Sequence, residues 1–103
     1  MPMLVLTAFV EVAIGDREAI AAALPQVIAS TRAEDGCEDY GCYEDTQNPG
    51  RFVFVERWND KAALDRHLAT PHMAAWMKLA GPTMRSARGF LYEVSSSTEL
   101  KPR

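Results

Sequence analysis

A histidine and a glutamate that can share one apolar surface are the residues of this sequence best suited to chemistry. Strand periodicity puts Phe54, Glu56 and Trp58 on one face, because side chains two residues apart point the same way. His67 follows in a segment with helical spacing, on the side that also carries leucines. If this helix packs over the strand, Glu56 can orient His67 and stabilise its charged form, which poises a general base near neutral pH.

Each candidate also has a purely structural interpretation, which the sequence leaves open. Glu56 could form an ion pair with an Arg or Lys across the sheet, and His67 could be a core or pocket-rim histidine. His72 fits a local role at a helix start or at the rim of a pocket. Tyr40 and Tyr43 are expected on opposite faces of one strand, so at most one of them reaches the same pocket.

Several kinds of site are not indicated. His67, His72 and Glu56 do not match a recognised metal-ligand spacing, so we expect no metal site. No glycine-rich phosphate loop follows a strand, and no Gly-x-Ser-x-Gly elbow is present. Cys37 and Cys42 are expected on opposite faces of a strand, about 16 Å apart and beyond disulfide reach. We interpret them as reduced, packed thiols in a cytoplasmic protein.

The composition is that of one small globular domain. The chain has 103 residues, of which 48% are hydrophobic and 24% charged, with a formal net charge of −3. No cluster of Lys and Arg is present, so neither nucleic acid nor an anionic membrane is expected as a partner. No apolar run approaches the roughly 20 residues that span a bilayer, and the first residues lack a signal peptide's basic region.

The pattern of apolar residues predicts one domain over residues 1–95 and a polar tail over residues 96–103. The expected order is strand, helix, strand, strand, helix, strand. The expected strands cover residues 3–12, 37–46, 51–58 and 87–95, and the expected helices cover residues 17–34 and most of 59–81.

Particular residues predict how these elements begin, bend and end. Asp16 and Thr70 are expected to cap helices, and Gly36 to stop the first helix in a left-handed conformation. Pro25 lies inside the first helix and predicts a kink or two abutting helical pieces. Gly41 predicts a bulge in the second strand.

The order of elements is that of a ferredoxin-like α+β fold, a four-stranded antiparallel sheet with the helices on one face. The first strand is apolar on both faces, since Leu4 and Leu6 share one side and Val5 and Phe9 share the other. The face away from the helices therefore needs a cover. The sequence predicts a homodimer in which the sheets of two copies cover each other.

The chain resembles the antibiotic biosynthesis monooxygenase family over nearly its whole length. The residues that carry the resemblance, in chain order, are Gly36-Cys37, Tyr40, Asn48-Pro49-Gly50-Arg51-Phe52, Glu56-Arg57-Trp58, Ala63-Leu64, His67-Leu68 and Pro71-His72. The resemblance implies a dimeric α+β barrel with a pocket between the sheet and the helices of each subunit. It implies that Tyr40, Glu56, Trp58, His67 and His72 line that pocket.

The resemblance also implies a cofactor-independent monooxygenase for a small quinol, phenolic or anthrone-like substrate. In this interpretation His67 takes a proton, Glu56 orients it, Trp58 and Phe54 hold the aromatic ring, and the substrate anion reacts with dioxygen. No haem is expected, because Met77 stands near the position of the haem-ligating histidine of haem-degrading relatives.

Two alternatives remain open. One is an isomerase or tautomerase of the autoinducer-2-processing type, and the other is a non-catalytic dimeric protein for a small ligand or for stress. Pro25 departs from the uninterrupted first helix of the family, which affects the expected shape of the pocket.

Overall fold

The computed structural model describes residues 2–102, folded as a four-stranded sheet with helices on one side. The elements in chain order are β1 (Met3–Val12), η1 (Ile14–Asp16), α1 (Arg17–Arg32), β2 (Cys37–Glu44), β3 (Arg51–Trp58), α2 (Lys61–Leu68), α3 (Pro71–Ala80), η2 (Gly81–Thr83) and β4 (Met84–Val94). The sheet order is β2-β3-β1-β4, and each neighbouring pair is antiparallel. The predicted ferredoxin-like fold is confirmed.

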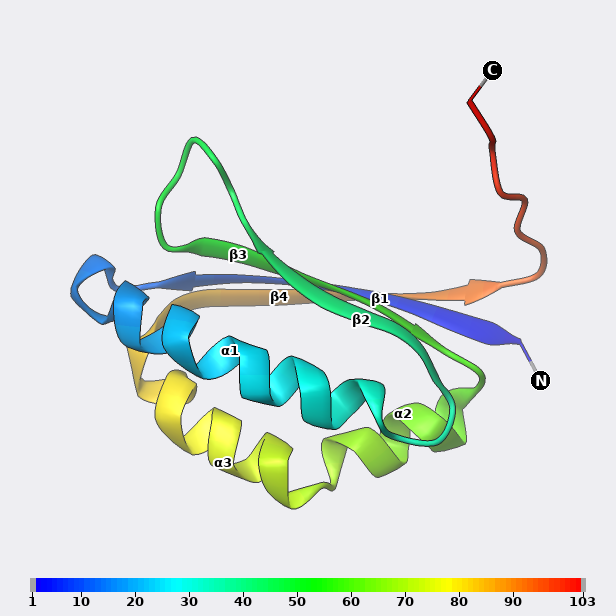
Figure 1. Cartoon of the computed structure of the whole chain (residues 1–103), viewed down its shortest axis with the longest axis horizontal. Helices are drawn as coiled ribbons and strands as arrows, with labels where there is room; N and C mark the ends of the chain where they lie inside the picture. Colours follow the sequence, from blue (N-terminus) through cyan, green and yellow to red (C-terminus); the bar gives the residue numbers. More distant parts are fainter. Residues whose placement is uncertain (1, 103) are drawn as a thin grey trace.

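The two central strands bring the predicted apolar faces together in register. Leu4 lies opposite Trp58 and Leu6 lies opposite Glu56, on the side of the sheet that the helices cover. Figure 1 shows α1, α2 and α3 below the sheet, while the loop between β2 and β3 and the C-terminal tail rise on the other side. The core therefore lies between one face of the sheet and the helices, and no helix or strand among residues 2–102 covers the other face.

The element ends differ slightly from the prediction. β2 ends at Glu44, two residues earlier than expected, and β4 begins at Met84, three residues earlier. Residues 95–102 contain no helix or strand. None of the helices found between residues 2 and 102 has the length and apolar character needed to cross a membrane.

Local signals determine the starts of the later helices but not of α1. The side chain of Asp60 accepts from Ala63 N, and that of Thr70 accepts from Met73 N, with Pro71 in the first turn. Asp16 precedes α1 as predicted, but its side chain makes no capping hydrogen bond, so the predicted cap is wrong.

Of the two expectations for Pro25, a kink or two abutting helical pieces, the second is wrong, because α1 continues through this residue as one helix. Pro25 lies on the exposed side of α1, between the buried Leu24 and Val27. The missing backbone donor is therefore on the solvent side, where water can replace it. Burial of the apolar stripe on either side keeps the helix continuous.

The prediction of a bulge at Gly41 is wrong in position, because Gly41 pairs in register with Val55 and the bulge lies at the start of β2. This bulge changes the placement of both cysteines. The register against β3 shifts between Cys37 and Asp39, so that Cys37 lies opposite Trp58 and Cys42 opposite Phe54. The prediction that the cysteines occupy opposite faces is wrong, because the extra residue shifts the alternation by one. Both thiols are free and packed against the core.

Gly36 is expected to tolerate no side chain. Its φ is +84°, and a Cβ there would lie 2.5 Å from the Cβ of Ala63 on α2. Gly36→Ala should lower the free energy of unfolding by about 2 to 3 kcal/mol, measured by urea denaturation, because strain and overlap add. Gly15→Ala is the control, since a Cβ added at Gly15 would meet nothing within 4 Å. Equal destabilisation by both substitutions would contradict the assignment.

Candidate active site

A row of aromatic rings fills the space between the sheet and the helices. The rings of Trp58 and His67 have centroids 4.7 Å apart, and those of His67 and Tyr40 are 5.5 Å apart. Phe54 follows at 6.0 Å from Tyr40, and Trp76 at 5.9 Å from Phe54. The predicted assembly of Phe54, Trp58 and His67 on one side of the sheet is therefore observed, with Tyr40 as the direct neighbour of His67.

The carboxylate that contacts His67 is Glu34, a residue that no pattern in the sequence singled out. The Oε2 atom of Glu34 lies 2.9 Å from Nδ1 of His67 and 2.7 Å from Nε2 of His72. The expectation that Glu56 orients His67 is therefore wrong, because the carboxylate that contacts His67 belongs to Glu34. An imidazole–carboxylate contact is present, but the carboxylate comes from the turn after α1.

Three tight contacts hold this group in place. Gly36 approaches the Ala63 side chain closely enough to exclude a Cβ, which brings the turn that carries Glu34 against α2. Asn59 N donates to Gly36 O at 2.8 Å, which ties the same turn to the end of β3. Thr70 Oγ1 donates to His67 O at 2.8 Å, which fixes the junction of α2 and α3 between the two histidines.

The shared carboxylate oxygen determines which ring nitrogens carry protons. An ionised carboxylate only accepts hydrogen bonds, so Nδ1 of His67 and Nε2 of His72 both donate to Glu34. In the neutral form of His67 the remaining nitrogen, Nε2, then holds the lone pair. His67 is 1% exposed, so this lone pair lies within the protein, while the side chain of His72 is 27% exposed at the rim.

Glu56 is a buried carboxyl group that contacts the indole of Trp58. It is 4% exposed, and Trp58 Nε1 donates to its Oε1 at 2.9 Å. Burial raises the pKa of Glu56 to about 7, the Trp58 hydrogen bond opposes this increase, and the charge of Glu34 adds to it. Across the described chain, Glu56 forms no ion pair, so the cross-sheet pairing with Arg or Lys is not observed.

The remaining titratable groups on this face are held in their neutral forms. Burial raises the pKa of Cys37 to about 11 and that of Cys42 to about 12, so both thiols are protonated at neutral pH. Burial also raises the pKa of the Tyr40 hydroxyl above its ordinary value, with a further contribution from the charge of Glu56. Thiolate chemistry at this site is therefore disfavoured.

The pocket expected between sheet and helices is closed in this structure. Three cavities on the surface of residues 2–102 are not lined by Glu56, Trp58 or His67. The rings of Trp58 and Tyr40 occupy the space beside His67. The candidate site is thus a packed aromatic layer with the cluster of Glu34, His67 and His72 at its edge.

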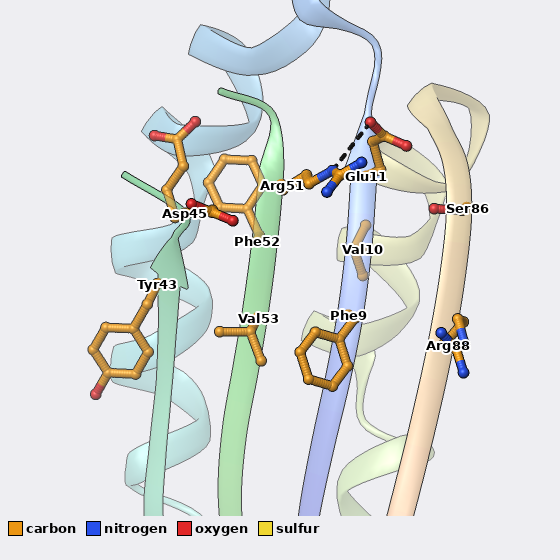
Figure 2. A pocket seen from close by; sticks show the side chains of 11 residues that line it. Phe9, Val10, Glu11, Tyr43, Asp45, Arg51, Phe52, Val53, Ser86 and Arg88 are labelled. Carbon is orange, nitrogen blue, oxygen red and sulfur yellow. Dashed lines mark ion pairs between the residues drawn. The ribbon is translucent and has the colours of Figure 1, made fainter. Parts of the chain in front are cut away.

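A cavity of about 530 Å³ lies instead on the outer face of the sheet. Figure 2 shows Tyr43, Val53, Phe9 and Arg88 in a row across the four strands, with Arg51 and Glu11 paired above them. These side chains point away from the helices, so this cavity is separated from His67 by the sheet.

Glu34 could have been noticed in the sequence for one reason. An acidic residue at the C-terminal end of a helix is unfavourable, because the end of the helix carries partial negative charge. Glu34 follows α1 by two residues and stands next to Asp35, where a basic residue would be expected. This placement signals a requirement for the carboxylate, although not its partner.

The sequence of residues 3–79 matches the profile of a family described as antibiotic biosynthesis monooxygenase. The chain belongs to the antibiotic biosynthesis monooxygenase family. The curated relatives include "Putative monooxygenase Rv0793" of Mycobacterium tuberculosis, 45% identical over 54% of this chain, and "Putative monooxygenase YcnE" of Bacillus subtilis, 31% identical over 73% of this chain and 79% of its own length. "Probable quinol monooxygenase YgiN" of Escherichia coli is 29% identical over 58% of this chain. The aligned stretches span 54% of Rv0793 and 65% of YgiN.

The solved structure of Rv0793 has the same fold as this member of the family. It superposes with a TM-score of 0.85 at 28% identity, covering 94% of this chain and 99% of that chain. The resemblance that the sequence suggested is therefore confirmed at the level of family and fold.

Proposed function

We propose that this chain is a cofactor-independent monooxygenase that oxidises a small quinol or phenol with dioxygen. The observation that carries the proposal is the contact between His67 and Glu34 beside the rings of Trp58 and Tyr40. Membership of the family supports the reaction class, and the relative named as a quinol monooxygenase supports the substrate class.

The proposed reaction balances without a further reductant. A quinol and one dioxygen give a hydroxyquinone and one water, so one oxygen atom enters the ring and the other leaves as water. All four electrons come from the substrate. The protein has to remove a proton, because the quinol anion gives up an electron to dioxygen more readily than the neutral quinol.

His67 accepts this proton at Nε2 in the proposal. Its Nδ1–H stays on Glu34, and the imidazolium that forms faces the Glu34 carboxylate at 2.9 Å. Glu34 thus takes the orienting role that was expected of Glu56, while Glu56 fixes the Trp58 indole through the bond at 2.9 Å. His72 shares the carboxylate of Glu34 and holds it from the solvent side.

Substrate entry requires side chains to move. His67 is 1% exposed and Trp58 is 0% exposed, so no ring can reach Nε2 while the aromatic layer is closed. The proposal therefore includes a displacement of Tyr40 or Trp58 when the substrate binds, which replaces one aromatic contact with another.

The same proposal includes a homodimer formed by the outer faces of two sheets. Phe9, Tyr43, Phe90 and Tyr92 are between 37% and 57% exposed on this face or its edge strand. An apolar face of this kind is unusual for a free monomer and is covered by a second copy in our proposal. We also place the protein in the cytoplasm, where its free cysteines stay reduced.

Oxygen uptake with a panel of quinols and anthrones tests the function. His67→Ala should lower kcat/KM by about 100-fold or more, because a positioned base contributes about 10²- to 10⁴-fold. Glu34→Gln should lower kcat with little change in KM, and Glu34→Asp should recover part of the loss. Asp65→Asn is the matched control, since Asp65 lies on the same helix as His67 but pairs only with the exposed Lys61.

The isotope content of the product and the requirement for oxygen distinguish the competing functions. Isotopically labelled dioxygen should place one labelled atom in the product. Turnover that persists without oxygen would indicate an isomerase or tautomerase instead. Equal activity in wild type and His67→Ala would refute the role of His67, and ligand binding without any turnover would favour a non-catalytic binding protein.

A further inference from the structure

We propose that Glu34, His67 and His72 form a binding site for a divalent transition-metal ion such as Zn²⁺. Each residue offers one ligand atom, and the three atoms lie within 4.8 Å of one another. The chain contains two histidines in all, and both lie in this cluster. Spacing along the chain did not reveal the cluster, because its carboxylate comes from a distant turn and not from β3.

Two distances between the ligand atoms are close to those found around a first-row metal ion. With bonds of about 2.0 to 2.2 Å, two ligand atoms at right angles are about 2.9 Å apart, and at the tetrahedral angle about 3.3 Å. Oε2 of Glu34 lies 2.9 Å from Nδ1 of His67 and 2.7 Å from Nε2 of His72. On binding one ion, Nε2 of His72 would move slightly away from Oε2 of Glu34, and the partial exposure of His72 leaves room for this movement.

The donor types define the class of ion. Two imidazoles and one carboxylate suit zinc and the neighbouring transition metals, whereas calcium and magnesium prefer oxygen ligands. Three protein ligands leave at least one coordination position for water. Such a position would face solvent, because the side chains of Glu34 and His72 are 14% and 27% exposed, while the buried His67 keeps the site fixed to the core.

The ion would use the same atoms that now share hydrogen bonds. An ion bound to Nδ1 of His67 replaces the proton that this nitrogen donates to Glu34, so the ion and the hydrogen bond exclude each other. The inference rests on the ligand atoms alone and does not depend on the proposed oxygenase activity.

Calorimetric titration of tag-free protein with Zn²⁺, without any substrate, tests the site. We expect one ion per chain with a Kd on the order of 1 μM or below. His72→Ala and Glu34→Gln should each weaken binding by at least about tenfold. His72 is at the rim, so its variant is expected to stay folded, and circular dichroism of each protein checks this. The double variant Cys37→Ser with Cys42→Ser is the control for thiol binding and should bind Zn²⁺ like wild type.

The identity of the ligating atoms has an independent readout. Zn²⁺ should shift the nitrogen resonances of Nδ1 in His67 and Nε2 in His72, measured by two-dimensional NMR of labelled protein. Absence of Zn²⁺ binding, equal affinity in wild type and His72→Ala, or loss of binding in the double cysteine variant would each overturn the inference. Both proposals use Glu34 and His67, but Zn²⁺ affinity is measured without substrate and oxygen uptake is measured without added Zn²⁺, so the failure of one can be told from the failure of the other.

Discussion

Glu56→Gln is expected to abolish a pH-dependent destabilisation of the wild-type chain. Between pH 4.5 and pH 8, the free energy of unfolding of wild type should fall by about 2 to 3 kcal/mol because of Glu56. Burial raises the pKa of Glu56 from its ordinary 4.5 to about 7. The folded chain therefore binds the Glu56 proton more tightly than the unfolded chain. The stabilisation that this proton gives to the folded chain is fully present below pH 4.5 and is lost as the pH rises through 7.

The difference between variant and wild type isolates this group. Urea denaturation followed by tryptophan fluorescence should give similar stabilities near pH 4.5 and a more stable Glu56→Gln protein at pH 8. Glutamine keeps an oxygen that can accept from Trp58 Nε1 and cannot ionise. Protein concentration must be held constant, because association also stabilises the folded state. Parallel pH curves for the two proteins would contradict the prediction.

Glu44 is a control, because its pKa is lowered and its effect on stability has the opposite pH dependence. Arg17 pairs with both of its oxygens and Gly50 N donates to it, and these contacts lower the pKa of Glu44 to about 2. Its contribution to stability is present above its ordinary pKa and is lost as the pH falls through 2. Glu44→Gln should therefore be less stable than wild type at pH 8, with the gap closing in acid.

Phe9→Glu is expected to convert a dimer into a monomer. Phe9 lies on the outer face of a central strand, 48% exposed, and its ring meets that of Phe90 with centroids 6.1 Å apart. A carboxylate at this place in a sheet-to-sheet interface would be taken out of water, which costs several kcal/mol even where Arg88, opposite it on β4, can pair with it. Light scattering coupled to size-exclusion chromatography at about 10 μM should give twice the 11.4 kDa chain mass for wild type and the single mass for the variant.

Met77→Glu is the matched control for this substitution. Met77 has the same 48% exposure but lies on α3, on the far side of the sheet from the outer face. It should leave the dimer intact, and circular dichroism should show both variants folded. A wild-type chain that is monomeric at this concentration, or a Phe9→Glu protein that stays dimeric, would rule out the proposed interface.

The sequence was sufficient wherever the cause of a structure is local. β3 covers residues 51–58 as predicted, because alternation within one strand assigns Phe54, Glu56 and Trp58 to the buried face. The cap at Thr70 was also readable, since a capping side chain bonds to an amide three residues away. The family resemblance and the ferredoxin-like order followed from such local signals taken in series.

Predictions failed where one residue changes a register or where burial outweighs propensity. The extra residue at the start of β2 placed Cys37 and Cys42 on the same face, and alternation alone cannot reveal a bulge. Pro25 did not divide α1, because its ring is on the solvent side and the buried stripe holds the helix together.

The sequence by itself determined the elements, their order and the apolar face that brings Trp58 beneath His67. Only the tertiary structure decided which carboxylate meets the imidazole. Glu34 is 33 residues from His67 in the chain and reaches it because Gly36 packs without a side chain against Ala63. Glu56 shares the face of Trp58 and bonds to it instead. Spacing along the chain decides which residues share a face, but a contact between two elements depends on how closely their backbones approach.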